Sequence, residues 1–296
     1  MTKMTYPQRT LYALERQEAE PIDTSLPRDA DRLRQNGEAP LIGVVIVNWN
    51  GCRDTMDAVA SARALTWPRT RVYVVDNAST DGSEEKLRAW ALGLTIIQSG
   101  NNLGWSGGNN VGIRAALSDG CAHVLLLNND ATIRPDALTL LVEAAEALPD
   151  AASIGALIVK SDDPSSVEFA GADIDPCTHM PRQKFGSLNE FNLSPDPVPA
   201  VAVKGCAMLL TATGLAKVGL LTEDYFLNFD ETDWCYRANA IGLQHLLVTR
   251  AVFEHKGAVS FGGFDGPPYR YFMTRNRLVF ARRHLGIRGR WYATAR

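Results

Sequence analysis

The chain has 296 residues, of which 46% are hydrophobic and 21% are charged, and its formal net charge is -3 at pH 7. This length and composition predict a globular protein that can bury a full core in one large domain or two small ones. The slightly negative charge excludes a protein that coats nucleic acid through a broad basic surface.

Residues 1–40 are rich in charged residues, proline and polar side chains, and we expect a flexible N-terminal extension there. From residue 41 onwards, short apolar runs alternate with segments of helical periodicity. We predict strands at 41–47, 71–75, 94–98 and 123–127, alternating with helices at 54–65, 83–90, 108–117 and 135–147. This alternation predicts an α/β fold of the Rossmann-like kind, with right-handed βαβ units and a mostly parallel sheet flanked by helices.

The second half of the chain has a different pattern. Residues 160–200 hold many Asp, Pro, Gly and Ser residues, which predicts long loops with short strands. Further along, we predict strands at 201–210 and 246–252, a helix at 233–241 and an amphipathic helix at 267–285. We therefore expect one domain over 41–296, with a nucleotide-binding half (41–150), a continuous acceptor and catalytic half (151–266) and a basic helical segment (267–296).

Cysteine usage and the N-terminal sequence both bear on location. The five cysteines are scattered without CxxC spacing, which is typical of reduced thiols rather than a disulfide framework or a zinc site. The N-terminus is charged where a signal peptide would be apolar, and the longest clean apolar run, 41–47, is far shorter than a membrane span. We expect a cytoplasmic protein.

Polar loops follow the first three predicted strands, at 48–51, 76–82 and 101–110. In a doubly wound sheet these loops meet at one edge, where ligands bind. Asp76 is suited to accept hydrogen bonds from a base or a ribose, and Gly104, Gly107 and Gly108 would let backbone N–H groups approach phosphate at a helix start. Ordinary turn chemistry is the alternative for each loop. The absence of GxGxxG argues against a dinucleotide cofactor.

The segment 128–130, Asn-Asn-Asp, follows the buried run 123–127 directly. A carboxylate at the end of a buried strand, here that of Asp130, suits Mg²⁺ or Mn²⁺ shared with a substrate diphosphate. The alternative is that these residues cap the helix that begins near Pro135.

Three acids, Asp230, Glu231 and Asp233, open the next predicted helix. Part of this cluster can be explained by the helix dipole, but mutual repulsion would also raise at least one pKa, as a general base near neutral pH requires. His255 follows a predicted strand. With Asp130 available it is a candidate second ligand to the same ion, although an isolated histidine is more often a core or surface residue.

The last part of the chain, 266–296, contains many arginines interleaved with aromatic residues and no Asp or Glu. Such a segment fits an anionic membrane surface or a lipid-linked diphosphate acceptor. A solvated helix whose apolar stripe packs on the core would have the same composition, and the sequence favours neither interpretation.

These motifs, taken in order, resemble the signature of family 2 glycosyltransferases, which adopt the GT-A fold. The resemblance rests on residues 45–51, 75–82, 102–109 and 128–130. The acids of 229–234, His255, and Tyr271 with the Arg-Asn-Arg of 275–277 are similar to its rhamnosyltransferase-like branch. The likeness covers roughly 41–285.

The resemblance implies inverting, metal-assisted sugar transfer from a nucleotide diphosphate sugar. It places Asp130 at the position of the last acid of the DxD metal motif and His255 at the position of a metal ligand. It places Glu231 at the position of the catalytic base, with Asp233 and Asp230 as alternatives. Asn128 departs from the family, because DxD has an acid there, and this departure weakens the expected affinity for a bare metal ion. The nucleotide-sugar-binding candidates are Asn48, Asn50, Asp76, Ser79, Asn102, Gly104, Gly108, Asn109 and Asn129.

The branch resemblance favours dTDP-rhamnose as the donor, followed by a UDP-sugar such as UDP-galactofuranose, and a cell-surface glycan or its lipid-linked precursor as the acceptor. Two alternatives belong to other classes of protein. A sugar nucleotidyltransferase would need a glycine-rich basic loop after the first strand, where residues 48–51 read Asn-Trp-Asn-Gly. A non-catalytic sugar-nucleotide-binding module would not need the acids of 230–233.

Overall fold

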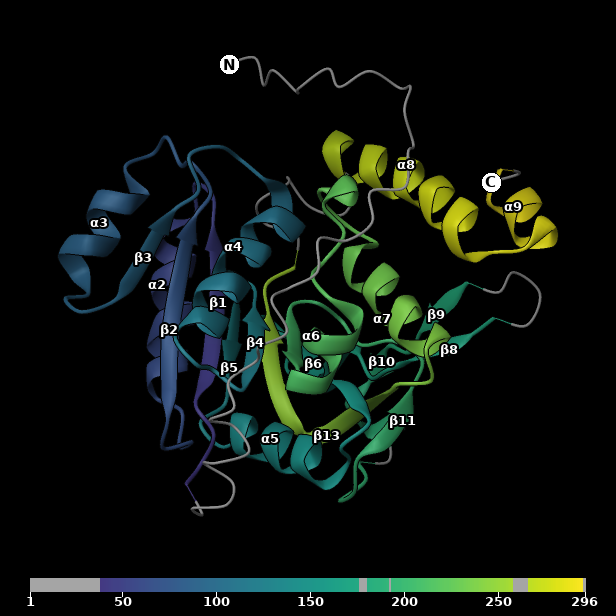
Figure 1. The fold of residues 1–296 in the computed structure, drawn as a ribbon, viewed down its shortest axis with the longest axis horizontal. Coiled ribbons are helices and arrows are strands. Elements are labelled where there is room, and N and C mark those ends of the chain that lie inside the picture. Colours follow the sequence, from purple (N-terminus) through teal and green to yellow (C-terminus); the bar gives the residue numbers. More distant parts are fainter. Residues whose placement is uncertain (1–37, 176–179, 192, 258–265, 295–296) are drawn as a thin grey trace.

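The computed structural model describes residues 38–175, 180–191, 193–257 and 266–294 (Figure 1). Most of the predicted N-terminal extension, 1–40, lies outside the described residues. The first half alternates strands and helices as the sequence predicts. Its elements are β1 (Ile42–Asn48), α2 (Cys52–Arg63), β2 (Thr70–Asp76), α3 (Ser83–Trp90), β3 (Thr95–Gln98), α4 (Gly104–Ser118), β4 (His123–Leu127), β5 (Ala131–Ile133) and α5 (Ala137–Ala147).

The second half combines short strands with two long ones. Its elements are β6 (Ala151–Lys160), β7 (Ser166–Phe169), β8 (Ala172–Ile174), β9 (Pro181–Gln183), β10 (Gly186–Ser187), β11 (Val198–Ala200), β12 (Ala207–Leu210), α6 (Ala212–Val218), α7 (Asp230–Ala240), β13 (Gln244–His255), α8 (Pro267–His284) and α9 (Ile287–Thr294), with short 3-10 helices at Leu188–Glu190 and Glu223–Tyr225.

The main sheet is parallel at its centre and mixed as a whole. Strands β3, β2, β1 and β4 lie side by side in parallel, and β12 pairs antiparallel with β4 and with β6. Strand β13 runs parallel to β6 and antiparallel to β5 and β11. The predicted parallel sheet is therefore confirmed for the first half, and antiparallel strands from the second half extend it.

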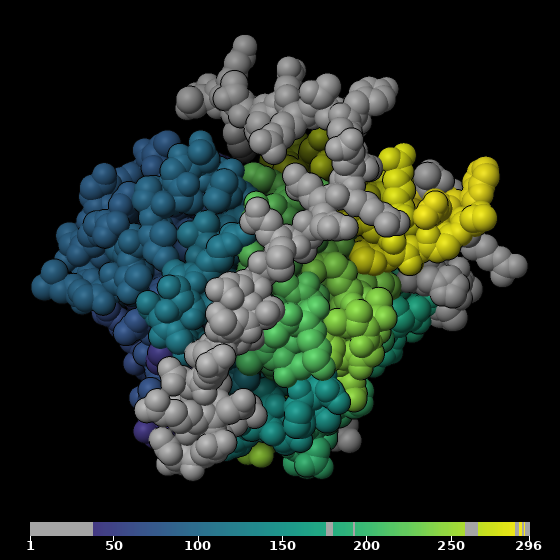
Figure 2. Space-filling view, in the orientation of Figure 1, coloured from purple at the N-terminus to yellow at the C-terminus, as the bar shows by residue number. Residues whose placement is uncertain are grey.

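One apolar core joins the two halves. It includes residues of both, among them Val44 and Leu126 from the first and Ile154, Leu209 and Phe253 from the second. In Figure 1, α2 and α4 cover opposite faces of β1 and β2. The space-filling view in Figure 2 shows the first half, in purple and blue, beside the second half, in green.

Some predicted elements are wrong in extent. The predicted strand 201–210 pairs only over Ala207–Leu210, and the preceding residues form a loop. Helix α4 begins at Gly104 rather than at residue 108, and α7 begins at Asp230 rather than at residue 233. Helix α4 therefore starts inside a segment that we had read as a polar loop, and α7 starts at the first of the three acids that we had expected to open a helix. Strand β6 and helices α6 and α9 were not predicted, because β6 is rich in alanine and the two helices are short.

Helices α8 and α9 lie together at one end of the molecule, with α8 across the start of α7 (Figure 1). A small cluster that includes Tyr225, Phe280, Leu285 and Ala293 joins them to the body of the protein. In the part of the chain that the structure describes, no helix combines the length and apolar character needed to cross a membrane.

Candidate active site

Polar side chains at the carboxyl ends of β1, β2 and β3 lie opposite one another at the same edge of the sheet. Asn48 lies opposite Asp76 in the register, and Asp76 lies opposite Gln98. Asp76 is fully buried and accepts hydrogen bonds from Asn48 Nδ2 at 2.7 Å and from Gln98 Nε2 and Ser79 N at 3.0 Å each. Burial alone would raise the pKa of Asp76, but these hydrogen bonds lower it below its ordinary value. The group is therefore a carboxylate at neutral pH.

The first two loops are hydrogen-bonded to each other. Ser79 Oγ accepts a hydrogen bond from the backbone N–H of Asn50 at 2.9 Å, and Asn50 Oδ1 accepts one from the backbone N–H of Thr80 at 2.7 Å. The predicted nucleotide contacts Asn48, Asn50, Asp76 and Ser79 thus form a closed rim around the sheet edge. The residues of these two loops that line the adjacent cavity are Trp49 and Asn77.

The glycines of the third loop allow close packing at the start of α4. Gly104 has φ of +72°, and a Cβ there would lie 2.3 Å from the carbonyl oxygen of Phe226. Its N–H already bonds to Asn102 Oδ1 at 3.0 Å. A Cβ on Gly108 would lie 2.7 Å from Val47. We had expected these glycines to let backbone N–H groups approach phosphate; in the structure they let α4 lie close to β1 and to the loop before α7.

A cavity of about 550 Å³ opens beside this edge, between the two halves. Both halves supply candidate site residues to its wall. They are Asn102, Gly104, Asn109, Asn129, Asp130, Asp230, Glu231 and His255. The first half also contributes Asn128, whose Oδ1 accepts a hydrogen bond from the indole of Trp105 at 2.8 Å.

Strand pairing brings Asp130 and His255 together. His255 ends β13, which pairs with β5 so that His255 stands opposite Ala131, and Lys256 N donates to the Asp130 carbonyl at 2.9 Å. His255 Nε2 lies 3.2 Å from Asp130 Oδ1, and both residues are buried. The helix-cap alternative for residues 128–130 is wrong, because Asp136 holds the N-cap position of α5.

Two charged residues that the sequence did not single out, Glu168 of β7 and Lys204, complete this cluster. Both carboxylate oxygens of Glu168 lie within hydrogen-bonding distance of His255 Nδ1, at 2.8 and 3.0 Å. The ammonium group of Lys204 pairs with the same carboxylate. The available signal for Glu168 was a single acid inside the otherwise apolar or small strand Ser-Val-Glu-Phe. Lys204 lies in the stretch that we had assigned to a continuous strand.

The cluster has an unusual electrostatic state. Burial alone would lower the pKa of His255, but the carboxylates of Asp130 and Glu168 raise it to about 9. Burial would raise the pKa of Glu168, but His255 and Lys204 lower it to about 2. His255 Nε2 is buried and has no partner with hydrogen-bond geometry, despite its closeness to Asp130.

His255 Nε2 and the adjacent Asp130 carboxylate suit a divalent cation, which would take the place of the Nε2 proton when it binds. Imidazole nitrogen and carboxylate oxygen are both ligands of Mn²⁺ and Mg²⁺ sites. Among the described residues, no three His, Cys, Asp or Glu side chains converge as a complete metal site. A cation between Asp130 and His255 would therefore take two ligands from these side chains, with the remaining positions left to substrate and water.

The three acids of α7 have different environments. Asp233 is turned away from the cavity and bonds to Thr222, Tyr225, Arg237 and His284 at 2.6 to 3.0 Å. Burial would raise its pKa, but these partners lower it. Asp233 is therefore committed to joining α7 to α8.

Asp230 and Glu231 both face the cavity. Asp230 is buried and accepts a hydrogen bond from Ser106 Oγ at 2.9 Å. Burial, reinforced by the neighbouring Glu231 carboxylate, raises the pKa of Asp230 well above its usual range. Burial and the neighbouring carboxylate thus favour the protonated form of Asp230, whereas Glu231 reaches the cavity from the first turn of α7 with more exposure to solvent.

The loop before α7 has a strained backbone. Phe226, Asn228 and Phe229 have φ of 65°, 65° and 71°, a conformation that costs a non-glycine residue roughly 1 kcal/mol or more. Leu227 N bonds to the Tyr225 carbonyl at 2.8 Å, which makes Phe226 the centre of a γ-turn.

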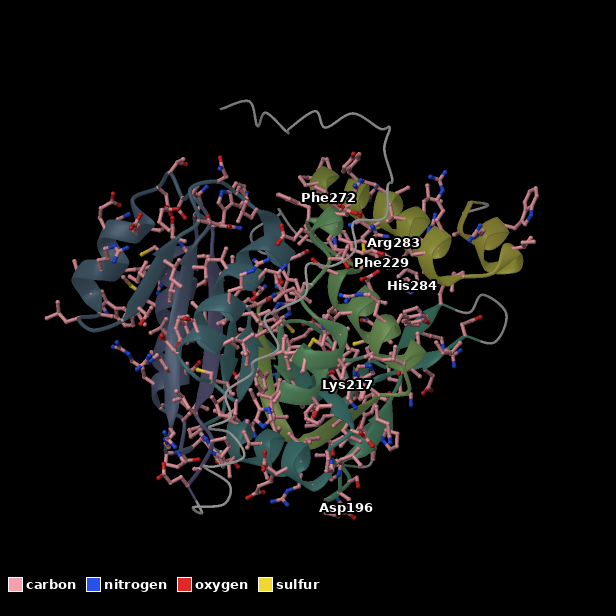
Figure 3. The ribbon with its side chains drawn as sticks, in the orientation of Figure 1. Asp196, Lys217, Phe229, Phe272, Arg283 and His284 are labelled. Atoms are coloured by element: carbon pink, nitrogen blue, oxygen red, sulfur yellow. The ribbon has the colours of Figure 1, made fainter. Side chains whose placement is uncertain are left out.

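Helix α8 holds this loop in place. Asn276 Nδ2 lies 2.6 to 2.9 Å from the carbonyl oxygens of Tyr225, Leu227 and Asn228. The Phe272 ring stacks on Phe226 at 5.1 Å. Figure 3 shows Phe229, Arg283 and His284 gathered where α8 meets the start of α7. The strained loop is therefore fixed between α4 and α8, directly before Glu231.

Comparison with known protein families gives a match that spans more than half of the chain and extends from the first half into the second. The model of glycosyl transferase family 2 matches residues 43–203. A low-salt glycan biosynthesis hexosyltransferase, Agl10, of Haloferax volcanii is 26% identical over 250 residues, which are 80% of this chain and 74% of the relative. The N-acetylglucosaminyl-diphospho-decaprenol L-rhamnosyltransferase of Mycobacterium tuberculosis is 25% identical over 225 residues, 69% of this chain and 72% of the relative.

Solved structures show the same fold. A mannosyltransferase from Pyrobaculum calidifontis in complex with GDP-Man and Mn²⁺ has a TM-score of 0.58 at 17% identity, over 86% of this chain and 69% of that one. GalNAc-T7 with UDP, GalNAc and Mn²⁺ also gives 0.58, at 15% identity, over 73% of this chain but only 44% of that one. The architecture is the GT-A fold of these glycosyltransferases, as the sequence predicted.

Proposed function

Because the chain belongs to glycosyl transferase family 2, we propose that it moves a sugar from a nucleoside diphosphate to an acceptor hydroxyl with inversion at the anomeric carbon. The observation that carries this proposal is the cavity between the halves, whose wall contains both the pair of Asp130 and His255 and the carboxylate of Glu231. A donor bound through its diphosphate at the first would present its sugar to the second. The nucleotidyltransferase and the non-catalytic module are not favoured by the family match.

We assign the cation site to Asp130 and His255, with Mg²⁺ or Mn²⁺ as the ion. Their buried carboxylate and unpartnered nitrogen fit such an ion. When bound, the ion neutralises negative charge on the leaving diphosphate. Asn128 stands where the metal motif of the family has an acid, and its oxygen is bonded to Trp105. The protein alone therefore contributes a single carboxylate to the ion, and we expect donor and ion to bind together.

Glu231 is the proposed general base. It takes the proton of the acceptor hydroxyl while that oxygen bonds to the anomeric carbon on the face opposite the diphosphate. The bond from the anomeric carbon to the phosphate oxygen breaks, and its electron pair leaves with the diphosphate. Burial and the Glu231 carboxylate raise the pKa of Asp230 and favour its protonated form, and Asp233 is held by four partners, so neither is as suited to accept a proton.

For the nucleoside, we propose that the rim built by Asn48, Asn50, Asp76 and Ser79 borders the base and ribose. Asn102, Gly104, Gly108, Asn109 and Asn129 stay candidates for the rest of the donor site, with Gly108 acting through packing. The donor that we favour is dTDP-rhamnose, followed by a UDP-sugar. The rhamnosyltransferase relative supports this order and supports a lipid-linked or glycan acceptor.

The predicted contact of 267–296 with an anionic membrane, and the predicted cytoplasmic location, remain predictions. Arg275, Arg283 and Arg290 make hydrogen bonds inside the protein, which reduces the basic face that would meet lipid. Tyr271, Ile287 and Trp291 are largely exposed on the same two helices. Flotation with anionic vesicles, compared with neutral ones, tests this contact.

A thermal-shift panel tests the donor site directly. We expect UDP or dTDP, or one of their sugars, to raise the unfolding temperature, and to raise it more with Mn²⁺ present. Incubation of the stabilising donor with candidate acceptors, followed by NMR of the new anomeric centre, then tests inversion. A retained anomeric configuration, or stabilisation by nucleoside triphosphates alone, would contradict the proposal.

A further inference from the structure

Glu168 occupies a bulge in the sheet. On the β6 side, Ile158 and Val159 are consecutive, but their partners on β7 are Phe169 and Val167. Glu168 is therefore the extra residue of the pair, and bulges re-aim side chains in this way next to functional sites. Its side chain is 12% exposed and lines the cavity. A carboxylate is thus brought into the interior by a specific irregularity of the backbone.

The ion pair with Lys204 does not by itself explain where the Glu168 carboxylate lies. Burying a carboxylate is costly, and one well-placed ammonium group would offset that cost. Glu168 instead has both oxygens within 3.0 Å of His255 Nδ1 as well. This bond fixes the orientation of the imidazole ring and determines which nitrogen is left over.

The nitrogen left over is Nε2, and it lies 3.2 Å from Asp130 Oδ1 without a hydrogen bond. In many metal sites a ligating histidine donates its other N–H to a carboxylate, which sets the tautomer and the direction of the ring. The arrangement of Glu168, His255 and Asp130 has this form.

We propose that Glu168 is a positioning residue, which holds His255 through Nδ1 so that Nε2 and the Asp130 carboxylate together face a divalent cation. Lys204 balances the charge of Glu168. The inference rests on the proposed function, because it requires that a cation binds between Asp130 and His255.

The test is direct titration of the full-length protein with Mn²⁺ in the presence of UDP, with free Mn²⁺ measured by electron paramagnetic resonance. For Glu168→Gln we expect the Mn²⁺ dissociation constant to rise about 10- to 100-fold, the usual cost of losing an outer partner of a ligand. The matched control is Glu146→Gln. Glu146 lies 3.1 Å from His123 Nε2, outside the cavity wall, and its replacement is expected to leave Mn²⁺ binding unchanged.

A double variant, Glu168→Gln with Lys204→Met, separates orientation from charge, because it removes one negative and one positive group together. It also leaves no buried ammonium without a partner, so it carries the test if the single variant does not fold. We expect it to bind Mn²⁺ as weakly as Glu168→Gln. Recovery of wild-type affinity in the double variant would overturn the proposal, since charge alone would then explain the loss.

The remaining outcomes separate this inference from the proposed function. If the unmodified protein binds Mn²⁺ with UDP but Glu168→Gln binds it equally well, the role of Glu168 is wrong and the cation site stands. If the unmodified protein binds no Mn²⁺ in the presence of either UDP or dTDP, the cation site itself is wrong and the role of Glu168 falls with it.

Discussion

The rim at the sheet edge and the wall of the cavity differ in how completely their polar groups are hydrogen-bonded. On the nucleotide side, Asp76 and its neighbours bond to one another and form a closed network. On the catalytic side, two residues that line the cavity, Asn228 and His255, have a buried nitrogen without a hydrogen-bond partner. The polar groups of the first side bond to one another, whereas the second side retains buried nitrogens without a hydrogen-bond partner and an acid, Asp230, whose pKa is raised. We infer that the chemistry takes place on the second side.

The largest effect is expected from a variant that removes the proposed general base on the catalytic side. Glu231→Gln keeps the shape of the side chain but cannot accept the proton, so we expect kcat to fall by about a hundredfold or more. Binding of UDP or dTDP with Mn²⁺ should stay unchanged. Glu143→Gln, on an exposed position of α5, is the control. Normal turnover by Glu231→Gln would move the base to another carboxylate.

The second prediction concerns His255 Nε2, the buried nitrogen without a hydrogen-bond partner. His255→Ala removes a proposed ligand, so the Mn²⁺ dissociation constant should rise by at least the roughly tenfold that loss of an outer partner costs. Isothermal titration with Mn²⁺ and UDP measures it. His245→Asn is the matched control, because His245 is equally buried but lies outside the cavity. Equal affinities in the His255 and His245 variants would contradict the ligand assignment.

A third prediction tests whether α8 is part of the catalytic side. Asn276→Ala removes three contacts to the carbonyls of the strained loop, which should lower stability by about 2 kcal/mol. It should also lower kcat more than it raises the donor KM, because the loop precedes Glu231. Thr274→Ala, on the exposed face of the same helix, is the control. A loss of stability with unchanged kcat would limit Asn276 to a structural role.

The smallest expected effect comes from His245, a buried histidine outside the cavity. Both nitrogens of His245 have partners, Ser153 Oγ at 2.8 Å and the Cys235 carbonyl at 3.1 Å, and burial lowers the pKa of His245 from 6.5 to about 4. The unfolded chain therefore binds a proton that the folded protein does not, so stability falls as pH drops from 6.5 towards 4. At pH 5.5 the loss is about 1.4 kcal/mol.

Thermal or denaturant unfolding at pH 8 and pH 5.5 measures this loss. His245→Asn carries no titrating ring, so its stability should change with pH by about 1.4 kcal/mol less than that of the unmodified protein. An identical pH dependence in both proteins would show that His245 is protonated in the folded state.

The sequence predicted those parts of the site that depend on local pattern. The strand ends that carry Asn48, Asp76 and Asp130 follow apolar runs, and the order of the loops indicated the fold. Glu168 and Lys204 could not be found in this way, because a one-residue bulge and a loop in place of a predicted strand bring them to His255. The tertiary partners of Asp230 and Asp233, Ser106 from α4 and His284 from α8, could not be read from the sequence either. These contacts form only when the chain is folded.

A crystal soaked with Mn²⁺ and either UDP or dTDP tests the proposed site most directly. We predict an anomalous difference peak for manganese between the Asp130 carboxylate and His255 Nε2, with the diphosphate against it and the nucleoside along the rim at Asp76. A diphosphate bound elsewhere, with no manganese between Asp130 and His255, would contradict the proposed mechanism.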